Sequence, residues 1–310
     1  MNTPLTQPAP RASEVASDSS NSSDAENASA VVRLGAISYL NVAPVYDWLT
    51  HCAADLPCVA LVDGVPAQMN RALEVGAVDI SNVSSVAFGQ HAREWALAPG
   101  LSVAAHGRVD SVLLFSWHAD WRSLDGRSIA LTNHSATSVE LTRLLAERRA
   151  GAHPRYVAMA PDLDAMLAQH DAALLIGDTA LREGYLRREI AGRGRPYVFD
   201  LAHEWQTWTG LPFVFAVWAM RADRAEAVRA AGIVELLRDS TARGLADLPR
   251  LAREASARLS LPARLCADYL RLLDYELSER DLHGLRHFLE LSIPDFRWED
   301  VRLLESESRL

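Results

Sequence analysis

The amino-acid sequence predicts an α/β protein of two lobes, with a ligand cleft between them and a helical C-terminal tail. Short apolar strands alternate with helical segments from Val31 onward, which indicates a mostly parallel sheet with helices on both faces. Two strong apolar strands, Ser111–Trp117 and Pro212–Met220, bracket the middle of the chain, and we expect them to cross between the lobes. Polar turns follow several strands, where α/β proteins bind ligands.

Before the first crossing strand, apolar runs predict strands and helices in alternation. Proline suits a first helical turn because the N–H that it lacks would be unpaired there anyway. Gly76 follows a helical pattern and suits the left-handed conformation that ends many helices. The expected elements are, in order, strand Val31–Ser38, helix Ala43–His51, strand Cys58–Asp63, helix Pro66–Val75, strand Val78–Ser81, a short helix and strand Leu101–Ala105.

A second set of alternating elements follows a turn-rich segment at Ala119–Arg127. Thr137 and Glu140 have the spacing of a capping box at the start of its first helix. The expected elements are strand Ser128–Thr132, helix Val139–Arg149, strand Tyr156–Met159, helix Asp162–Gln169, strand Ala172–Ile176, helix Thr179–Tyr185 and strand Pro196–Leu201. After Met220 we expect only helices, at Arg224–Ser240, Ala242–Leu259, Pro262–Leu273 and Glu279–Leu289.

These elements predict the domain organisation. Residues 31–117 and 212–310 would form lobe 1, and residues 118–211 would form lobe 2. Residues 1–30 are rich in Ser, Ala, Asn and Pro and contain no aromatic residue, so we expect them to be a disordered tail. They lack the basic start and apolar run of a secretory signal, which favours a cytoplasmic protein.

Composition excludes several classes of function. The net charge of −9 argues against a nucleic-acid binder, which needs a basic face. The sequence contains no lysine, so Schiff-base chemistry and a Walker-type phosphate site are excluded. The three cysteines, Cys52, Cys58 and Cys266, form no C-x-x-C pair, which argues against a zinc site or a disulfide framework. No window is long and apolar enough to span a membrane.

Polar turns between a strand and a helix are the candidate binding elements. Each would present free N–H groups and the positive end of a helix dipole to a carboxylate or phosphate. For any single turn, ordinary N-capping is the simpler explanation, but several such turns in both lobes favour a shared cleft. The turns are Ser38–Asn41, Asn82–Ser85, Asn133–Ser138 and Gly177–Thr179.

Three side chains in these turns are candidates for individual roles. Asn41 occupies an expected N-cap position, with its amide free to face the cleft. Asp178 follows a buried strand and could act as a base, an acid or a hydrogen-bond acceptor, or only cap the next helix. His134 could transfer a proton, although a lone loop histidine is more often only solvated.

Taken together, the motifs resemble the chorismate dehydratase family of the futalosine route to menaquinone. The similarity runs from about Val31 to Met220. The motifs are G-A-I-S-Y-L-N-x-x-P at Gly35–Pro44, R-V-D-S-V-L-L at Arg108–Leu114, T-x-x-S-x-T-S at Thr132–Ser138, L-L-I-G-D-x-A-L at Leu174–Leu181 and E-W-x-x-W-T-G-L-P-F-V-F-A-V-W at Glu204–Trp218.

The resemblance implies a two-lobed fold like that of type II periplasmic binding proteins. It also implies removal of water from chorismate to give 3-[(1-carboxyvinyl)oxy]benzoate, with no metal and no organic cofactor. The resemblance implies that Asn41, Ser111 and Asp178 take part in catalysis, and that Ser84, Ser85, Thr137 and Ser138 bind the substrate. From the polar turns themselves we also expect Ser38 and Ser135 to bind the substrate.

Two other functions remain open. One is a non-catalytic cytosolic binder of a small carboxylate, because a fold alone does not establish catalysis. The other is the sister enzyme of the same route, which forms 1,4-dihydroxy-6-naphthoate in a similar fold. The long motif at Glu204–Trp218 favours the dehydratase. The sequence leaves the oligomeric state open.

Overall fold

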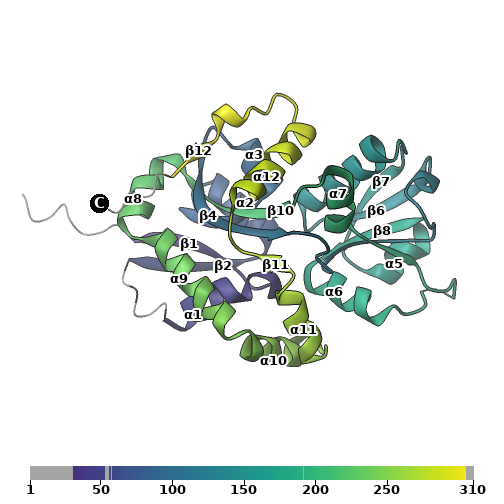
Figure 1. Cartoon of the computed structure of the whole chain (residues 1–310), viewed down its shortest axis with the longest axis horizontal. Coiled ribbons are helices and arrows are strands. Elements are labelled where there is room, and N and C mark those ends of the chain that lie inside the picture. The colour runs from purple at the N-terminus through teal and green to yellow at the C-terminus, as the bar shows by residue number, and fades with distance from the viewer. Residues whose placement is uncertain (1–30, 53–55, 57, 191, 305–310) are drawn as a thin grey trace, which may run out of the picture.

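The computed structural model describes residues 31–52, 56, 58–190 and 192–304. The expected disordered tail lies outside the described residues. The chain forms two lobes that lie side by side in Figure 1, each built on its own sheet. The α/β prediction is thus confirmed.

The first sheet has the strand order β11-β4-β10-β3-β1-β2, and β12 pairs with β4. Strand β1 runs parallel to β2 and β3, whereas β10 is antiparallel to β3 and β4. The two short strands β11 and β12 follow β10 in the chain, where only helices were expected. The bounds are β1 Val32–Ile37, β2 Val59–Gly64, β3 Ile80–Ser84, β4 Trp95–Ala105, β10 Phe213–Arg221, β11 Leu273–Asp274 and β12 Arg302–Leu303.

The second sheet has the order β7-β6-β8-β5-β9. Strands β6, β7 and β8 are parallel to one another, and β5 is antiparallel to β8 and β9. The bounds are β5 Val112–Ser116, β6 Ser128–Thr132, β7 Arg155–Met159, β8 Ala172–Ile176 and β9 Tyr197–Asp200.

The position of β5 corrects the expected division of the chain. Strand Ser111–Trp117 was expected to belong to lobe 1 and to cross between the lobes, but β5 lies inside the second sheet, between β8 and β9. The five residues of β5 are all buried. Such burial is typical of a central strand with both faces covered, not of an isolated connecting strand. The chain therefore crosses at residues 106–111, before β5 begins.

The helices largely follow the expected order. Helices α1 and α9 pack together on one side of the first sheet, with α3 and α12 on the other (Figure 1). The bounds are α1 Ala43–Cys52, α2 Pro66–Glu74, α3 Ser85–Gln90, α4 Ala136–Arg143, α5 Leu163–Gln169, α6 Gly177–Leu186, α7 Leu201–Thr209, α8 Ala225–Ala230, α9 Ile233–Ala246, α10 Leu248–Leu259, α11 Ala263–Leu270 and α12 Glu279–Ser292.

Helix α7 was not expected, although its ends carry recognisable signals. The Asp200 carboxylate accepts hydrogen bonds from the N–H groups of Ala202 and His203 at its start. Gly210 ends the helix in the left-handed conformation, with a φ of 74°. The buried Trp205 lies on α7, and its Nε1–H donates to the carbonyl of Pro212.

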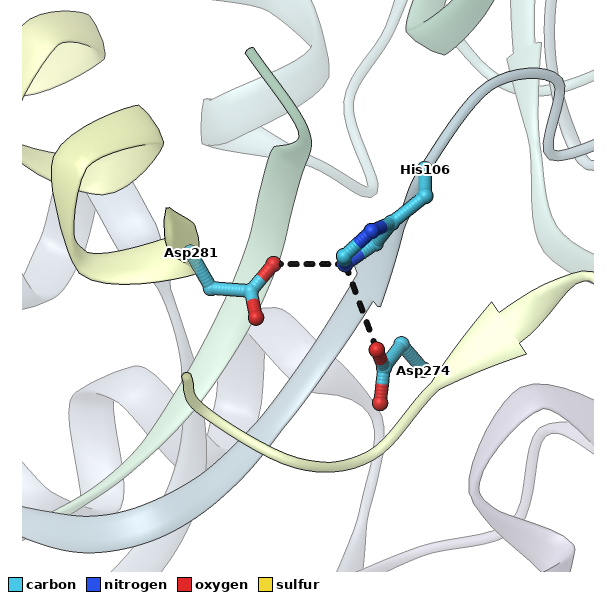
Figure 2. Close-up of side chains that lie close together, drawn as sticks. All are labelled: His106, Asp274 and Asp281. Carbon is cyan, nitrogen blue, oxygen red and sulfur yellow. Dashed lines mark hydrogen bonds and ion pairs between the residues drawn. The ribbon is translucent and has the colours of Figure 1, made fainter. Parts of the chain in front are cut away.

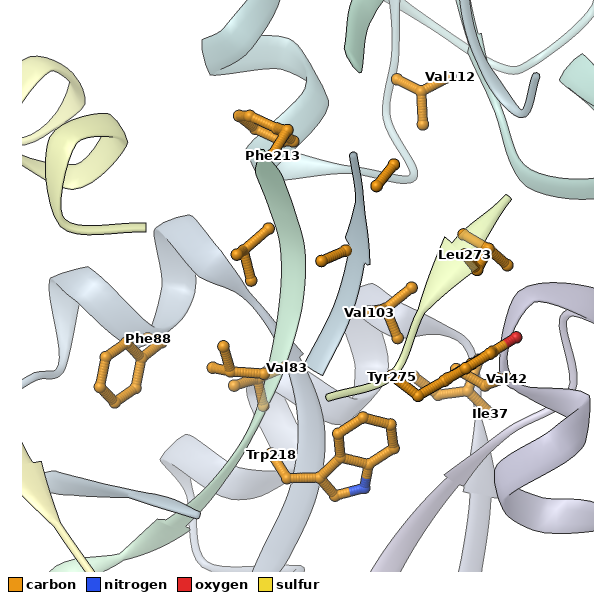
Figure 3. Packing of buried hydrophobic residues seen from close by; sticks show 14 of the residues in the cluster. Ile37, Val42, Val83, Phe88, Val103, Val112, Phe213, Trp218, Leu273 and Tyr275 are labelled. Carbon is orange, nitrogen blue, oxygen red and sulfur yellow. The ribbon is translucent and has the colours of Figure 1, made fainter. Parts of the chain in front are cut away.

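The core of the first lobe extends to the junction between the lobes. Figure 3 shows Val103, Val112 and Leu273 close to this junction, with Trp218 and Val83 deeper in the lobe. A separate apolar cluster, which includes Leu113, Phe115 and Met166, stabilises the second lobe. Close-packed apolar side chains therefore lie on both sides of the junction, and they fix the strand ends that face it.

Three carboxylates hold the crossing segment 106–111 in place. His106 Nε2 lies 2.9 Å from Asp281 Oδ1 and 3.2 Å from Asp274 Oδ2 (Figure 2). On the other side, Asp200 Oδ2 accepts from the N–H groups of Val109 and Asp110 at 2.9 and 2.7 Å. These contacts stabilise the backbone immediately before Ser111.

Candidate functional site

A cavity of about 410 Å³ lies between the two lobes, where strands of both sheets end. Its walls combine apolar side chains with amides and hydroxyls. Among the described lining residues there is no Asp, Glu or Arg. The described lining includes one histidine, His134. The polar lining residues are Tyr39, Asn41, Asn70, Asn82, Ser84, Ser111, Thr132, Asn133, His134, Ser135 and Ser138.

Asn41 lines this cavity from a short 3₁₀ turn, Leu40–Val42, that precedes α1. It was expected to be an N-cap, but the N-cap residue of this turn is Tyr39. The main-chain oxygen of Asn41 accepts a hydrogen bond of 2.9 Å from the hydroxyl of the buried Tyr275. Its side-chain Oδ1 is buried and has no protein partner among the described residues. The amide is thus held by its backbone and left free for a ligand.

Ser111 is a buried lining residue at the point where the chain enters the second lobe. Its Oγ accepts a hydrogen bond of 3.0 Å from the hydroxyl of Tyr269 on α11. Burial raises the pKa of Tyr269, so this phenol keeps its proton and remains a donor. Because the Ser111 oxygen is already an acceptor, its own O–H can donate to a ligand.

Ser84 and Ser85 have different surroundings although they are neighbours. Ser84 lines the cavity and is the N-cap of α3, where its Oγ accepts from the N–H of Ala87. It also accepts from the amide of Asn70, a lining residue that the sequence did not single out. Ser85 points away from the cavity and donates to the carbonyl of Val214 at 2.6 Å. Only Ser84 is therefore placed to reach a ligand.

The N-terminus of α4 forms the wall contributed by the second lobe. Ser135 is its N-cap, and its Oγ accepts from the N–H of Ser138 and donates to the Ser138 Oγ. Both serines line the cavity. The helix therefore begins at Ser135, and the expected capping box at Thr137 and Glu140 is wrong because Thr137 already lies within the first turn.

Thr137 instead joins the lobes. Its Oγ1 accepts a hydrogen bond of 3.0 Å from the N–H of Val86, in the first turn of α3 in the other lobe. It is not among the lining residues of the cavity. Its hydroxyl satisfies an N–H group that a helix start leaves unpaired, and so it favours the approach of the two lobes.

Asp178 also joins the lobes and does not line the cavity. Its Oδ1 accepts from the N–H of Leu40 at 3.1 Å, and its Oδ2 lies 3.0 Å from Arg258 Nη1 on α10. Ser38 lies in a second hollow, beside Arg258 and outside the 410 Å³ cavity. The structure thus brings together Asn41, Ser84, Ser111, Ser135 and Ser138, and separates Ser38, Ser85, Thr137 and Asp178 from their cavity.

Asn82 is a lining residue that the sequence placed in a polar turn. It lies inside β3 rather than after it, because β3 continues to Ser84 between β1 and β10. The side chain is 4% exposed, and its Nδ2 has no protein partner among the described residues. The signal was the polar run itself, which was expected to form a turn because it ended the predicted strand at Ser81.

The sequence is similar to those of known proteins. The family model for menaquinone biosynthesis matches residues 32–292. A protein of Thermus thermophilus named chorismate dehydratase is 38% identical over 271 residues, which are 84% of this chain and 95% of that protein.

Solved structures resemble the chain in fold. A protein of Archaeoglobus fulgidus has a TM-score of 0.66 at 19% identity, over 84% of this chain and 96% of that one. The periplasmic aliphatic sulphonate binding protein SsuA of Escherichia coli has a TM-score of 0.61 at 17% identity, over 84% and 91%. The expected periplasmic-binding-protein-like fold is confirmed. No helix among the described residues has the length and apolarity needed to cross a membrane.

Proposed function

The chain belongs to the menaquinone biosynthesis family, and on that premise we propose that it is a chorismate dehydratase. The reaction removes water from chorismate and gives 3-[(1-carboxyvinyl)oxy]benzoate in the futalosine route. The main support is the 38% identity to the Thermus thermophilus enzyme over most of both chains. We also propose that the protein works in the cytoplasm.

The chemistry of the cavity fits this substrate. Chorismate carries two carboxylates on a largely apolar frame, and the cavity offers hydroxyl and amide groups on apolar walls. The start of α4 presents free N–H groups, and a helix N-terminus contributes about 0.3–1 kcal/mol to binding a negative charge. A site of this kind holds the substrate in one orientation, and orientation of the reacting groups lowers the barrier.

The dehydration requires one proton to leave carbon and one hydroxyl to leave its neighbour. The base takes the proton from the ring carbon that bears the enolpyruvyl ether, the C–O bond of the neighbouring hydroxyl breaks, the hydroxide takes up a proton and leaves as water, and the ring becomes aromatic. We propose that Asn41 and Ser111 hold the substrate, while Ser135 and Ser138 bind a carboxylate. Asn41 cannot be the base because an amide accepts no proton near neutral pH.

We consider two candidates for the base, Asp178 and the side-chain carboxylate of the substrate itself. Asp178 is engaged by the Leu40 N–H and by Arg258, and it is not among the lining residues. The described lining contains no carboxylate side chain at all. These observations support the substrate carboxylate as the base.

We expect Asp178→Asn to keep most of the activity. The change weakens the ion pair with Arg258, whose side chain is 50% exposed, and exposed pairs contribute about 0–1 kcal/mol. We therefore expect a loss of kcat/KM below about tenfold, whereas removal of a general base typically lowers the rate about 10²–10⁴-fold. Single-turnover kinetics with chorismate would isolate the chemical step.

Arg258→Gln is the matched control, because it breaks the same ion pair from the other side. The two variants should behave alike, and the double variant should lose no more than either one. A hundredfold slower chemical step in Asp178→Asn alone would make Asp178 the base.

The function itself is tested by incubating the purified protein with chorismate, without added metal or cofactor. Chromatography with mass detection should show an aromatic product lighter than chorismate by one water. Unchanged chorismate in the presence of folded protein would reject the dehydratase. Titration with carboxylates and an assay for 1,4-dihydroxy-6-naphthoate would then separate the binder from the sister enzyme.

A further inference from the structure

We infer that the side-chain amide of Asn82 is an anion-binding group of the cavity, which donates from Nδ2 to a carboxylate oxygen of the substrate. The inference rests on the proposed function for the identity of that substrate. The anion-binding role of Asn82 is argued from the groups of the cavity itself. An experiment can therefore reject this role and the proposed function separately.

The position of Asn82 is fixed by the middle of the first sheet. Strand β3 lies between β1 and β10, and side chains alternate between the two faces of a strand. Asn82 and Ser84 are two residues apart, share a face and both line the cavity. Ala216 of β10 lines it as well, directly opposite Ser84 in the strand pairing. Asn82 thus projects from a rigid wall rather than from a loop.

The amide of Asn82 is not used by the fold. Its Nδ2 is buried and donates to no described residue. A buried donor without a partner is unfavourable for folding, whereas an apolar side chain of the same shape would pack there without that penalty. A ligand that brings an acceptor removes the penalty, and a carboxylate oxygen is a stronger acceptor than a neutral group.

The cavity wall of the first lobe also carries an acceptor that is unpaired among the described residues, Asn41 Oδ1. Asn41 lines the same cavity, and its buried Oδ1 accepts from no residue that the structure describes. The first lobe therefore presents a donor at Asn82 and an acceptor at Asn41, which suit a molecule that carries both a carboxylate and a hydroxyl. The start of α4 faces the cavity from the other lobe and would take the second carboxylate of a dianion.

A bound water is the competing explanation. Trp218 lies opposite Asn82 in the pairing of β3 with β10, and its buried Nε1–H also donates to no residue in the described part of the chain. A water that bridges the Asn82 donor to other polar groups of the wall would satisfy it without any ligand. In that case, Asn82 would stabilise the fold and leave ligand affinity unchanged.

The test measures ligand binding by calorimetry, with 3-[(1-carboxyvinyl)oxy]benzoate as the dianion and benzoate as a single carboxylate. The variants are Asn82→Leu, which keeps the shape and removes the donor, and Asn82→Asp, which replaces the donor with a negative charge. We expect Asn82→Leu to weaken dianion binding about 10–100-fold, and Asn82→Asp to weaken it further, because a charge-assisted hydrogen bond becomes a repulsion.

Ser102→Ala is the control for stability. Ser102 is fully buried in β4, and its Oγ donates to the carbonyl of Glu276, away from the cavity lining. The variant should lower Tm and leave both dissociation constants unchanged. Wild-type affinity in Asn82→Leu, with or without a change in Tm, would overturn the inference and favour the bridging water.

The design separates the inference from the proposed function. If the wild type fails to dehydrate chorismate but Asn82→Leu still loses affinity for the dianion and benzoate, the function is wrong and the anion-binding role stands. If the wild type binds neither compound, the anion-binding role is rejected, whatever the activity.

Discussion

Asn41→Leu should abolish most of the dehydratase activity while leaving the protein as stable as the wild type, or more so. Leucine matches the shape of asparagine but carries no polar atoms. Loss of a substrate contact made by a preorganised polar group in a water-poor site typically lowers kcat by about 10²–10³-fold. The change also removes the buried and unpaired Oδ1, which by itself destabilises a fold by about 1–3 kcal/mol.

The opposite directions of these two effects make the prediction specific. Steady-state kinetics with chorismate gives the activity, and chemical unfolding gives the free energy of unfolding. The backbone contact from Tyr275 to the Asn41 carbonyl does not involve the side chain and should survive.

Thr241→Val is the control for Asn41→Leu, because we expect it to lower stability and to leave activity unchanged. The Thr241 hydroxyl is buried in α9 and already donates to the carbonyl of Leu237 at 2.7 Å. Its loss should lower the free energy of unfolding by about 0.5–1.5 kcal/mol and leave the activity intact. An Asn41→Leu protein that is destabilised in proportion to its lost activity would show that Asn41 is structural.

The elements that depend on local chemistry could be predicted from the sequence. Strand β8 lies at the expected Ala172–Ile176, because a short buried run between polar flanks leaves little choice of bounds. Helix α2 begins at Pro66, and Gly76 takes the left-handed φ of 72° just beyond its end. These features depend on residues within a few positions of one another.

The functions of individual polar side chains could be predicted only in part. The expected turns do meet at one cavity, since Asn41, Ser84 and Ser138 all line it. Asp178 and Thr137 have the right residue types in the right motifs, yet their partners belong to the opposite lobe. Asp178 binds the N–H of a residue 138 positions away, and local spacing carries no information about such a contact. The membership of β5 in the second sheet was missed for the same reason.

The close packing of α9 on α1 links the stability of the first lobe to the position of Asn41. A Cβ atom at Gly244 on α9 would lie 2.1 Å from the carbonyl oxygen and 2.5 Å from the Cα of Pro44. Both are backbone atoms in the first turn of α1, which directly follows the turn that holds Asn41. The backbone at this contact cannot rotate away, so one of the two helices must move.

Gly244→Ala should therefore destabilise the protein even though alanine favours helix formation by about 1 kcal/mol relative to glycine. Forcing an extra methyl group into a packed interface costs about 1–3 kcal/mol, and more where backbone atoms collide, so we expect a net loss of about 1–2 kcal/mol. Because α1 moves with the Asn41 turn, KM for chorismate should also rise. Thermal unfolding and steady-state kinetics on the same preparation measure both effects.

Gly184→Ala on α6 is the matched substitution, also within a helix. There the added Cβ would lie 2.5 Å from Leu113 Cδ1, the end of a flexible side chain that can change rotamer. Its stability should change little, because the gain in helix propensity of about 1 kcal/mol offsets the repacking of one leucine. Equal losses in the two variants would mean that glycine is needed for helix flexibility rather than for close approach. A Gly244→Ala protein with wild-type stability and KM would show that α1 and the Asn41 turn adjust freely, and the cavity wall could then not be regarded as rigid.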